Sequence, residues 1–183
     1  MSTRGDAGVA VATFAAVWAV LQPRGPYRLA TELGTQVLEL DALTATERAR
    51  AAYALPSALR YTGQIDTALA HLLLALRLNQ EVGDRRAQGR ALFLLGVLHS
   101  IQGRANETLQ CFRDALSVSR EAHDQINEIR CLDSLAGEYS APGQWEDALH
   151  LFHQALALSR ENGNRTLEAH VLCNLGIRHL GWA

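Results

Sequence analysis

The sequence contains no lysine: all 17 of its basic residues are arginine, set against 19 acidic residues, for a formal net charge of −2. A chain so close to neutral lacks the positive field of dedicated nucleic-acid binders and of proteins that bind anionic membrane surfaces. Cysteine is also scarce, with only Cys111, Cys131 and Cys173 and no CxxC spacing. This odd, sparse set favours a reducing compartment over a disulfide framework, so we predict a cytoplasmic protein.

Long hydrophobic runs are absent as well. The longest apolar run, residues 9–21, falls short of the ~20 residues that a membrane-spanning helix needs, and Asp6 interrupts the basic leader expected of a signal peptide. Prolines number only 4, whereas hydrophobic residues make up 48% of the chain. That composition excludes a disordered chain and predicts a folded protein with a sizeable core.

Sequence motifs of catalysis are missing too. There is no Gly-rich phosphate loop, no GxSxG and no HExxH. His150 and His153 lie three residues apart, a spacing that can hold a metal on a helix, but no further ligands converge on them and we interpret them as solvated. We therefore predict that the protein is not an enzyme and that it binds no cofactor or metal.

What the sequence does contain is an internal repeat of 40 residues. Shifting the chain by this length aligns turn-forming and apolar residues without a gap, namely Gly63, Gly103 and Gly143, then Leu69, Leu109 and Leu149, then Ala75, Ala115 and Ala155, and also Leu55, Leu95, Leu135 and Leu175. A shorter copy, with Gly25 in the place of Gly63, precedes them. Repeats of this length are typical of solenoid proteins.

Each copy predicts two helices, because its apolar residues recur at helical spacing, as in Leu69, Leu72 and Leu76. The glycines at 63, 103 and 143 suit a left-handed turn after the first helix, and Gly83 and Gly163 suit the same turn after the second. As N-caps the sequence offers Asp66 and Asn106 for the second helices and Asp84, Asp124 and Asn164 for the first helices.

The unit that carries Leu95-Gly96, His99, Gly103, Thr108, Phe112 and Ala115 resembles the tetratricopeptide repeat, in the 40-residue form of kinesin light chains and many bacterial regulators. Pro56, in the position of Gly96, departs from the pattern. The resemblance implies an all-α, right-handed superhelical solenoid of stacked antiparallel helix pairs. We predict a single domain over residues 1–183, with repeats at about 8–41, 45–82, 85–122 and 125–162 and a closing helix at 165–180.

In such solenoids the first helix of each pair lines a concave groove, which places a set of side chains there as candidate binding residues. They are Arg50, Tyr53 and Arg60 in the second unit, Arg90, Phe93, Val97 and Ile101 in the third, Arg130 in the fourth, and His170 in the closing helix. The same spacing also puts on the groove side Ser57, Asp133, Gly137, Cys173, Ile177 and Leu180. Arg50, Arg90 and Arg130, continued by His170, recur every 40 residues and could form a ladder that holds acidic side chains of a partner. Alternatively, each arginine pairs with a periodic acid such as Glu81, Glu121 or Glu161.

The resemblance implies a non-catalytic protein-interaction scaffold whose groove binds a peptide or a partner helix. One alternative is a sensor or regulatory segment of a larger bacterial signalling protein or transcription regulator. An RNA-binding helical repeat fits the net charge less well. The lysine-dependent carboxylate clamp of chaperone-binding members is excluded, and only Asn174 matches its asparagines. Phe93, Val97 and Ile101 form an apolar stripe that is either a docking site or core. A homodimer through the apolar N-terminal or C-terminal helix is also possible.

Overall fold

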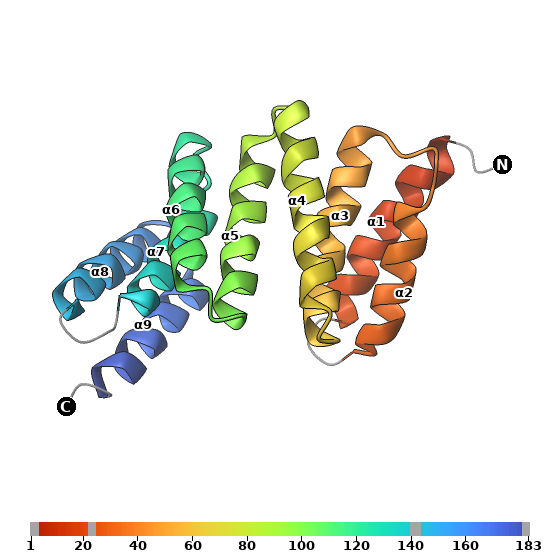
Figure 1. The fold of residues 1–183 in the computed structure, drawn as a ribbon. Helices are drawn as coiled ribbons and strands as arrows, with labels where there is room; N and C mark the ends of the chain where they lie inside the picture. Colours follow the sequence, from red (N-terminus) through yellow and green to blue (C-terminus); the bar gives the residue numbers. More distant parts are fainter. Residues whose placement is uncertain (1–3, 22–24, 140–143, 181–183) are drawn as a thin grey trace. The chain divides into compact units, whose positions relative to one another are not determined.

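The computed structural model describes residues 4–21, 25–139 and 144–180. Within these residues the chain forms nine α-helices and no β-strand (Figure 1). The helices are α1 (Arg4–Leu21), α2 (Tyr27–Leu38), α3 (Ala45–Tyr61), α4 (Ile65–Glu81), α5 (Arg85–Ile101), α6 (Ala105–Glu121), α7 (Gln125–Glu138), α8 (Trp145–Glu161) and α9 (Arg165–Leu180). The prediction of an all-helical protein is confirmed.

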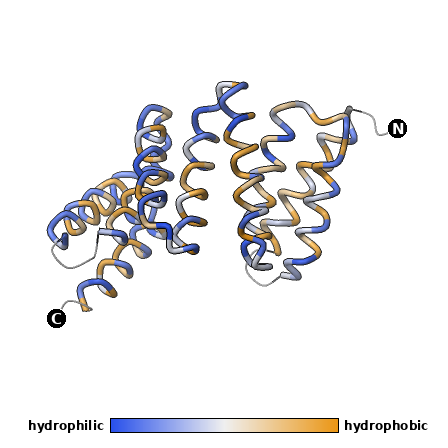
Figure 2. The backbone as a smooth tube through the Cα atoms, in the orientation of Figure 1, coloured by the Kyte–Doolittle hydropathy of each residue, from blue (hydrophilic) through white to orange (hydrophobic). Residues whose placement is uncertain are grey.

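The chain divides into two compact units, residues 1–91 and 92–183, and the division falls inside α5. The first unit holds α1 to α4 and the start of α5, and the second holds the rest of α5 and α6 to α9. The organisation of residues 1–183 as a single domain therefore stays a prediction. Most helices of both units carry hydrophobic and hydrophilic residues in turn along the chain, as amphipathic helices with one buried face require (Figure 2). The exception is α1, which is apolar over most of its length.

In the first unit, α2 packs on α1 and α3, and α4 packs on α3. Trp18, Ala30 and Ala58 form one buried cluster at the contact of the first three helices. Gly34 of α2 lies against the Phe14 ring of α1, so closely that a Cβ atom at position 34 would sit 2.5 Å from a ring carbon. Glycine is thus required where these two helices meet.

In the second unit, α6 packs on α7, and α8 packs on both α7 and α9. The core centres on Phe152, which is fully buried among Ile129, Leu132, Ala136 and Val171. Gly96 provides the equivalent close approach, because a Cβ atom there would lie 2.6 Å from the Phe112 ring. A small residue thus lies against an aromatic ring at this helix contact as well.

The turns between helices follow the predicted glycines. Gly63, Gly83, Gly103 and Gly163 all have positive φ angles, between 63° and 76°. His123 occupies the position of Gly83 and Gly163 in its repeat and also has a positive φ, at 52°. Gly143 lies outside the described residues. The repeated left-handed turn is therefore kept by the backbone even where the residue is not glycine.

The N-cap predictions are half right. Asp84, Asp124 and Asn164 each accept a hydrogen bond from the backbone N–H three residues later, as N-caps do. Asp66 and Asn106 are not N-caps, because α4 and α6 begin two residues after the turn glycine, with Gln64 and Arg104 at the cap positions. The two predicted residues lie in the first turn instead.

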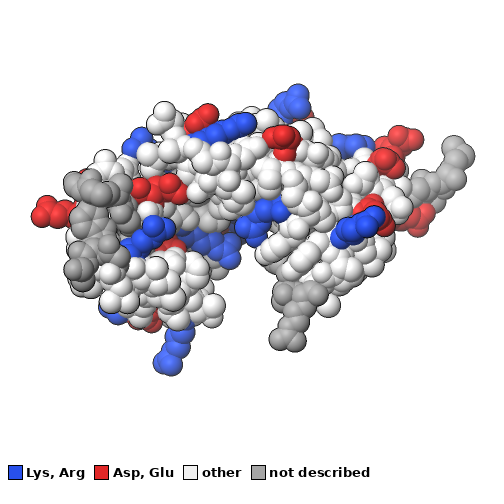
Figure 3. Space-filling model, turned by 60° about the horizontal axis from the view of Figure 1, so that its bottom comes forward, with Lys and Arg blue, Asp and Glu red and all other residues white. Residues whose placement is uncertain are grey.

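The surface carries charges of both signs, scattered among uncharged side chains on the face shown in Figure 3. Across the described helices, no segment is both long and apolar enough to cross a membrane.

Candidate binding site

Two hollows in the first unit share a wall formed by Arg50 and Tyr53 of α3. One, of about 320 Å³, is also lined by Arg86 and Arg90 at the start of α5. The other, of about 410 Å³, is lined by the apolar side of α1, including Val11, Ala12, Ala15 and Trp18. Arg50 and Tyr53 therefore stand between a basic hollow and an apolar one.

The start of α3 is fixed by local hydrogen bonds that position Arg50. Thr44 and Glu47 form a capping box, in which the Glu47 N–H donates to Thr44 Oγ1 at 3.2 Å and the Thr44 N–H donates to Glu47 Oε2 at 2.9 Å. The Arg48 guanidinium donates to the carbonyls of Leu38 and Leu40 after the last turn of α2, at 2.9 and 3.1 Å. Arg50 thus projects from a well-anchored helix end.

The basic hollow holds three arginines and one carboxylate, that of Asp84. The Asp84 carboxylate accepts the Ala87 N–H at 3.0 Å, so part of its acceptor capacity is used in capping α5. Arg50 is exposed and makes no hydrogen bond or ion pair with another described residue. The hollow therefore carries an excess of positive charge that suits a carboxylate.

Arg60, another predicted groove residue, lies elsewhere. Its guanidinium stacks over the Tyr61 ring, 4.7 Å from the ring centroid. Tyr61 in turn stacks on Tyr27 with 4.4 Å between centroids and lies 6.2 Å from Trp18. Arg60 thus belongs to an aromatic cluster at the end of α3 and lines neither of the two hollows.

A hollow of about 300 Å³ in the second unit gathers three further predicted residues, Phe93, Arg130 and His170. Phe93 is half-buried, with its ring 5.5 Å from that of Phe112, so this member of the predicted apolar stripe also contributes to the core. Arg130 is exposed and makes no hydrogen bond or ion pair with another described residue. Val97 is half-buried and Ile101 is 52% exposed, and neither lines this hollow.

The most unusual group in this hollow is Asp133, which is only 6% exposed. Its Oδ2 accepts a hydrogen bond from Asn174 Nδ2 at 2.8 Å and lies 3.2 Å from His170 Nδ1. Its Oδ1 is buried without a partner among the described residues. Burial raises the pKa of the Asp133 carboxyl, against the opposing effects of Asn174, His170 and Arg178.

Sequence reasoning placed Asp133 in the groove without identifying its role. The sequence does mark Asp133 as unusual, because the equivalent positions of the two preceding repeats carry the aromatic residues Tyr53 and Phe93. A carboxylate where other repeats place an aromatic ring must find polar partners or stay poorly solvated. Asn174, which matched a carboxylate-clamp position by sequence, serves as one of these partners.

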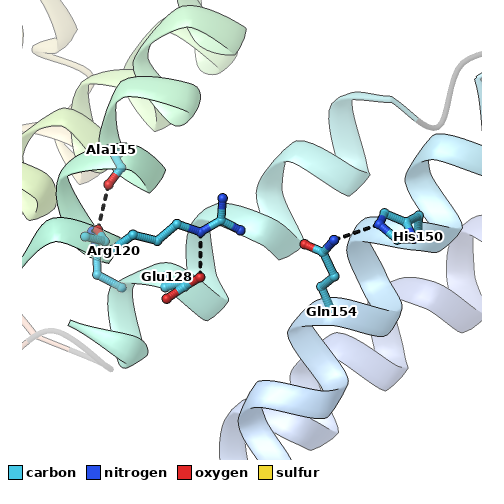
Figure 4. Close-up of polar contacts among 7 residues, drawn as sticks. Ala115, Arg120, Glu128, His150 and Gln154 are labelled. Carbon is cyan, nitrogen blue, oxygen red and sulfur yellow. Dashed lines mark hydrogen bonds and ion pairs between the residues drawn. The ribbon is translucent and has the colours of Figure 1, made fainter. Parts of the chain in front are cut away.

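Two ion pairs that recur at the repeat length join residues outside the ladder. Arg120 pairs with Glu128 at 2.8 Å, as Figure 4 shows, and 40 residues later Arg160 pairs with Glu168 at 2.6 Å. The ladder position His170 pairs with Asp133. Both arginine pairs bridge the end of one helix and the start of the next, and they leave the predicted groove face unaffected.

The Cys111 and Cys131 thiols line none of the three hollows. Burial raises the pKa of the Cys131 thiol to about 12, and burial also raises that of Cys111, so neither favours a thiolate. The Gln154 amide donates to the exposed His150 ring at 2.7 Å (Figure 4). In the part of the chain that the structure describes, no three histidine, cysteine or acidic side chains group as a metal site would require.

Several solved structures share this fold. Aspartyl phosphate phosphatase F from Bacillus subtilis superposes with a TM-score of 0.83 at 13% identity, over 97% of this chain and 46% of that one. A kinesin light chain-like repeat protein from Podosopora anserina gives 0.69 at 16% identity, over 98% and 97%. A Rap protein in complex with competence and sporulation factor gives 0.75 at 16% identity, over 97% and 54%. The chain thus spans about half the length of the phosphatase and the Rap protein, and at these identities the likeness shows the fold alone.

A comparison with curated proteins found no match. The tetratricopeptide repeat family matches residues 47–121 and, in an overlapping register, residues 95–161. The two matches together span residues 47–161, more than half of the chain. They include the Gly96 and Phe112 contact and the left-handed turns at Gly63, Gly83, Gly103 and His123. The fold is therefore a solenoid of paired helices, and the chain belongs to the tetratricopeptide repeat family.

Proposed function

We propose that this chain is a non-catalytic protein-interaction scaffold that binds a peptide or a partner helix through the groove side of its first helices. Its family and its fold support this role, since stacked helix pairs form extended binding surfaces. Two similar structures are complexes with peptides or signalling factors: the Rap protein with competence and sporulation factor, and the Rap conjugation gene regulator of plasmid pLS20 with the Phr* peptide.

The observation that carries the proposal is the position of Arg50. It lies between the basic hollow and the apolar hollow of the first unit, and no described residue neutralises it. A peptide that places a carboxylate against Arg50 and an adjacent apolar side chain against Val11 and Trp18 would use both hollows at once. Charged and apolar contacts of this kind give the affinity and the orientation of short peptide ligands.

The proposal is tested by selecting phage-displayed random octapeptides on the immobilised protein. We expect enrichment of sequences with an aspartate or glutamate next to an apolar residue. Synthetic versions of the selected peptides, titrated by fluorescence polarisation, should lose about tenfold or more in affinity on Arg50→Glu, because a charge-assisted contact becomes a repulsion.

The matched control is Arg77→Glu, on the exposed side of α4, which changes the net charge equally but lines neither hollow. It should leave peptide affinity unchanged at moderate salt. Selection of peptides without acidic residues, or equal losses in the two variants, would refute binding at the first-unit hollows. A fluorescent single-stranded RNA of random sequence serves as a further probe, and salt-sensitive binding of it would favour the nucleic-acid alternative.

A regulatory segment of a larger protein is the second candidate function. The chain spans 46% of aspartyl phosphate phosphatase F and 54% of the Rap protein, so those proteins carry further structure beyond the shared part. Immunoblotting of the native protein tests this candidate, with a polypeptide much longer than 183 residues as the supporting result. A cytoplasmic location and a homodimer through α1 or α9 likewise remain predictions.

A further inference from the structure

We propose that the second-unit hollow is a subsite for an aliphatic ammonium group, the lysine side chain of a bound peptide, with Asp133 as its charge partner. The proposal rests on the proposed function only for the source of the lysine. The site itself is defined by residues of α5, α7 and α9.

The first argument is the unfilled acceptor capacity of Asp133. An ionised carboxylate can accept about four hydrogen bonds. Asp133 has contacts only at Oδ2, from Asn174 and His170, while Oδ1 has no partner among the described residues. Arg178 acts on this carboxyl through its charge but donates no hydrogen bond to it. A buried carboxylate in this state is costly, and a ligand cation would offset that cost.

The second argument concerns which cation fits. With Oδ2 already engaged, a guanidinium would not find the two free oxygens that its fork needs, whereas an ammonium donates to single acceptors. Oδ1 is buried as the side chain stands, so an ammonium reaches it only if the carboxylate rotates about χ2, a torsion that is broad in aspartate.

The third argument is the lining of the hollow. Its polar lining residues are Arg130, Asp133, Ser134, Thr166 and His170, so an ammonium would bind beside the Arg130 guanidinium and would need its aliphatic stem to add affinity. The rest of the walls is made by Phe93, Ile129, Leu167 and Val171. Such walls suit the four methylene groups of a lysine, which favour apolar contact while the ammonium reaches a polar partner. These 183 residues include no lysine, so the group that fills the site must come from outside them.

The experiment uses NMR on the ¹⁵N-labelled chain with small probes in place of the unidentified peptide. N-acetyl-lysine methylamide is titrated beside two analogues. The norleucine analogue lacks the ammonium group, and the arginine analogue replaces it with a guanidinium. Norleucine amide with a free α-amine tests an N-terminal amine as the source. We expect the lysine probe to shift amides around Asp133 and His170, and to bind about tenfold more tightly than the norleucine analogue.

Two variants test the site. Asp133→Asn should abolish the preference for lysine over norleucine, whereas Asp147→Asn, an exposed carboxyl in the first turn of α8, should keep it. Thr166→Trp, at an exposed position on the rim, should block all probes without touching the core, and it stands in if Asp133→Asn fails to fold.

Equal binding of lysine and norleucine, tighter binding of arginine, or a lysine preference that survives Asp133→Asn would each overturn the proposal. A preference for the free α-amine over the lysine side chain would also overturn it, because the N-terminal amine would then be the source. Since the probes act in the second unit, these outcomes are independent of Arg50 and of the peptide selection that tests the proposed function.

Discussion

The hollows of the two units are built at the same positions of the repeat, and each presents an exposed arginine, Arg50 or Arg130, but they differ three residues further along the helix. In the first unit, Arg50 and Tyr53 present an unpaired guanidinium and a half-buried ring. The helices recur in the second unit, but Asp133, 80 residues after Tyr53, places a buried carboxylate at that position, in contact with His170 and Asn174. The comparison teaches that the repeat fixes where a groove side chain points, while the side chain itself is free to change.

The cores of the two units make the same point about packing. In the second unit the small residue, Gly96, is on the first helix of its pair and the ring of Phe112 is on the second. In the first unit the order is reversed, with Phe14 on α1 and Gly34 on α2. Close packing requires a small residue opposite a large one, and either helix can supply either partner.

The largest loss of stability is expected from removing a large side chain from the core of one unit. Phe152→Ala removes a fully buried ring and should cost about 3–5 kcal/mol of unfolding free energy. Because Phe152 belongs to the core cluster of the second unit, hydrogen exchange followed by mass spectrometry should accelerate most in α7, α8 and α9. The matched variant Leu55→Ala, fully buried in the first unit, should accelerate α1 to α4 instead. Identical exchange patterns in the two variants would mean that the units open together.

A smaller effect is expected from the buried carboxylate that sets the second hollow apart. Since burial raises the pKa of Asp133, the folded state holds its proton more tightly than the unfolded state. Stability should therefore fall as the pH rises from the ordinary aspartate pKa through the raised folded pKa, and then stay at the lower level. Asp133→Asn should remove this loss and be more stable than the wild type at neutral pH.

Urea unfolding across that pH range measures the difference, with Asp147→Asn as the exposed control. The control should keep the wild-type pH profile within about 0.5 kcal/mol. A neutral-pH loss of stability in Asp133→Asn would show instead that the hydrogen bonds to Asn174 and His170 outweigh burial.

The sequence predicted the helices, the family and most turns, because these depend on residues such as Gly103 and Leu109 that recur at the 40-residue spacing. It placed Arg50, Arg90 and Arg130 on the groove side by the same period, and each of them lines a hollow, but their role in binding stays a prediction. It did not predict that Arg60 would stack on Tyr61, because that contact depends on an aromatic cluster formed by residues far apart in the chain. The partners of Asp133 were missed for the same reason, as Asn174 lies 41 residues away.

The smallest effect concerns the turn at which the repeats differ, where Gly83 and Gly163 are matched by His123. A side chain at positive φ costs about 1–2 kcal/mol, and glycine gives back about 0.5–1 kcal/mol through the entropy of the unfolded chain. His123→Gly should therefore raise the unfolding free energy by about 0.5–1 kcal/mol, and Gly163→His should lower it by a similar amount. Urea midpoints at constant m-value measure both changes. A loss of stability in His123→Gly would show that contacts of the histidine ring outweigh the backbone strain. His123 would then stabilise this turn, and the difference from Gly83 in the first unit would have a structural cause.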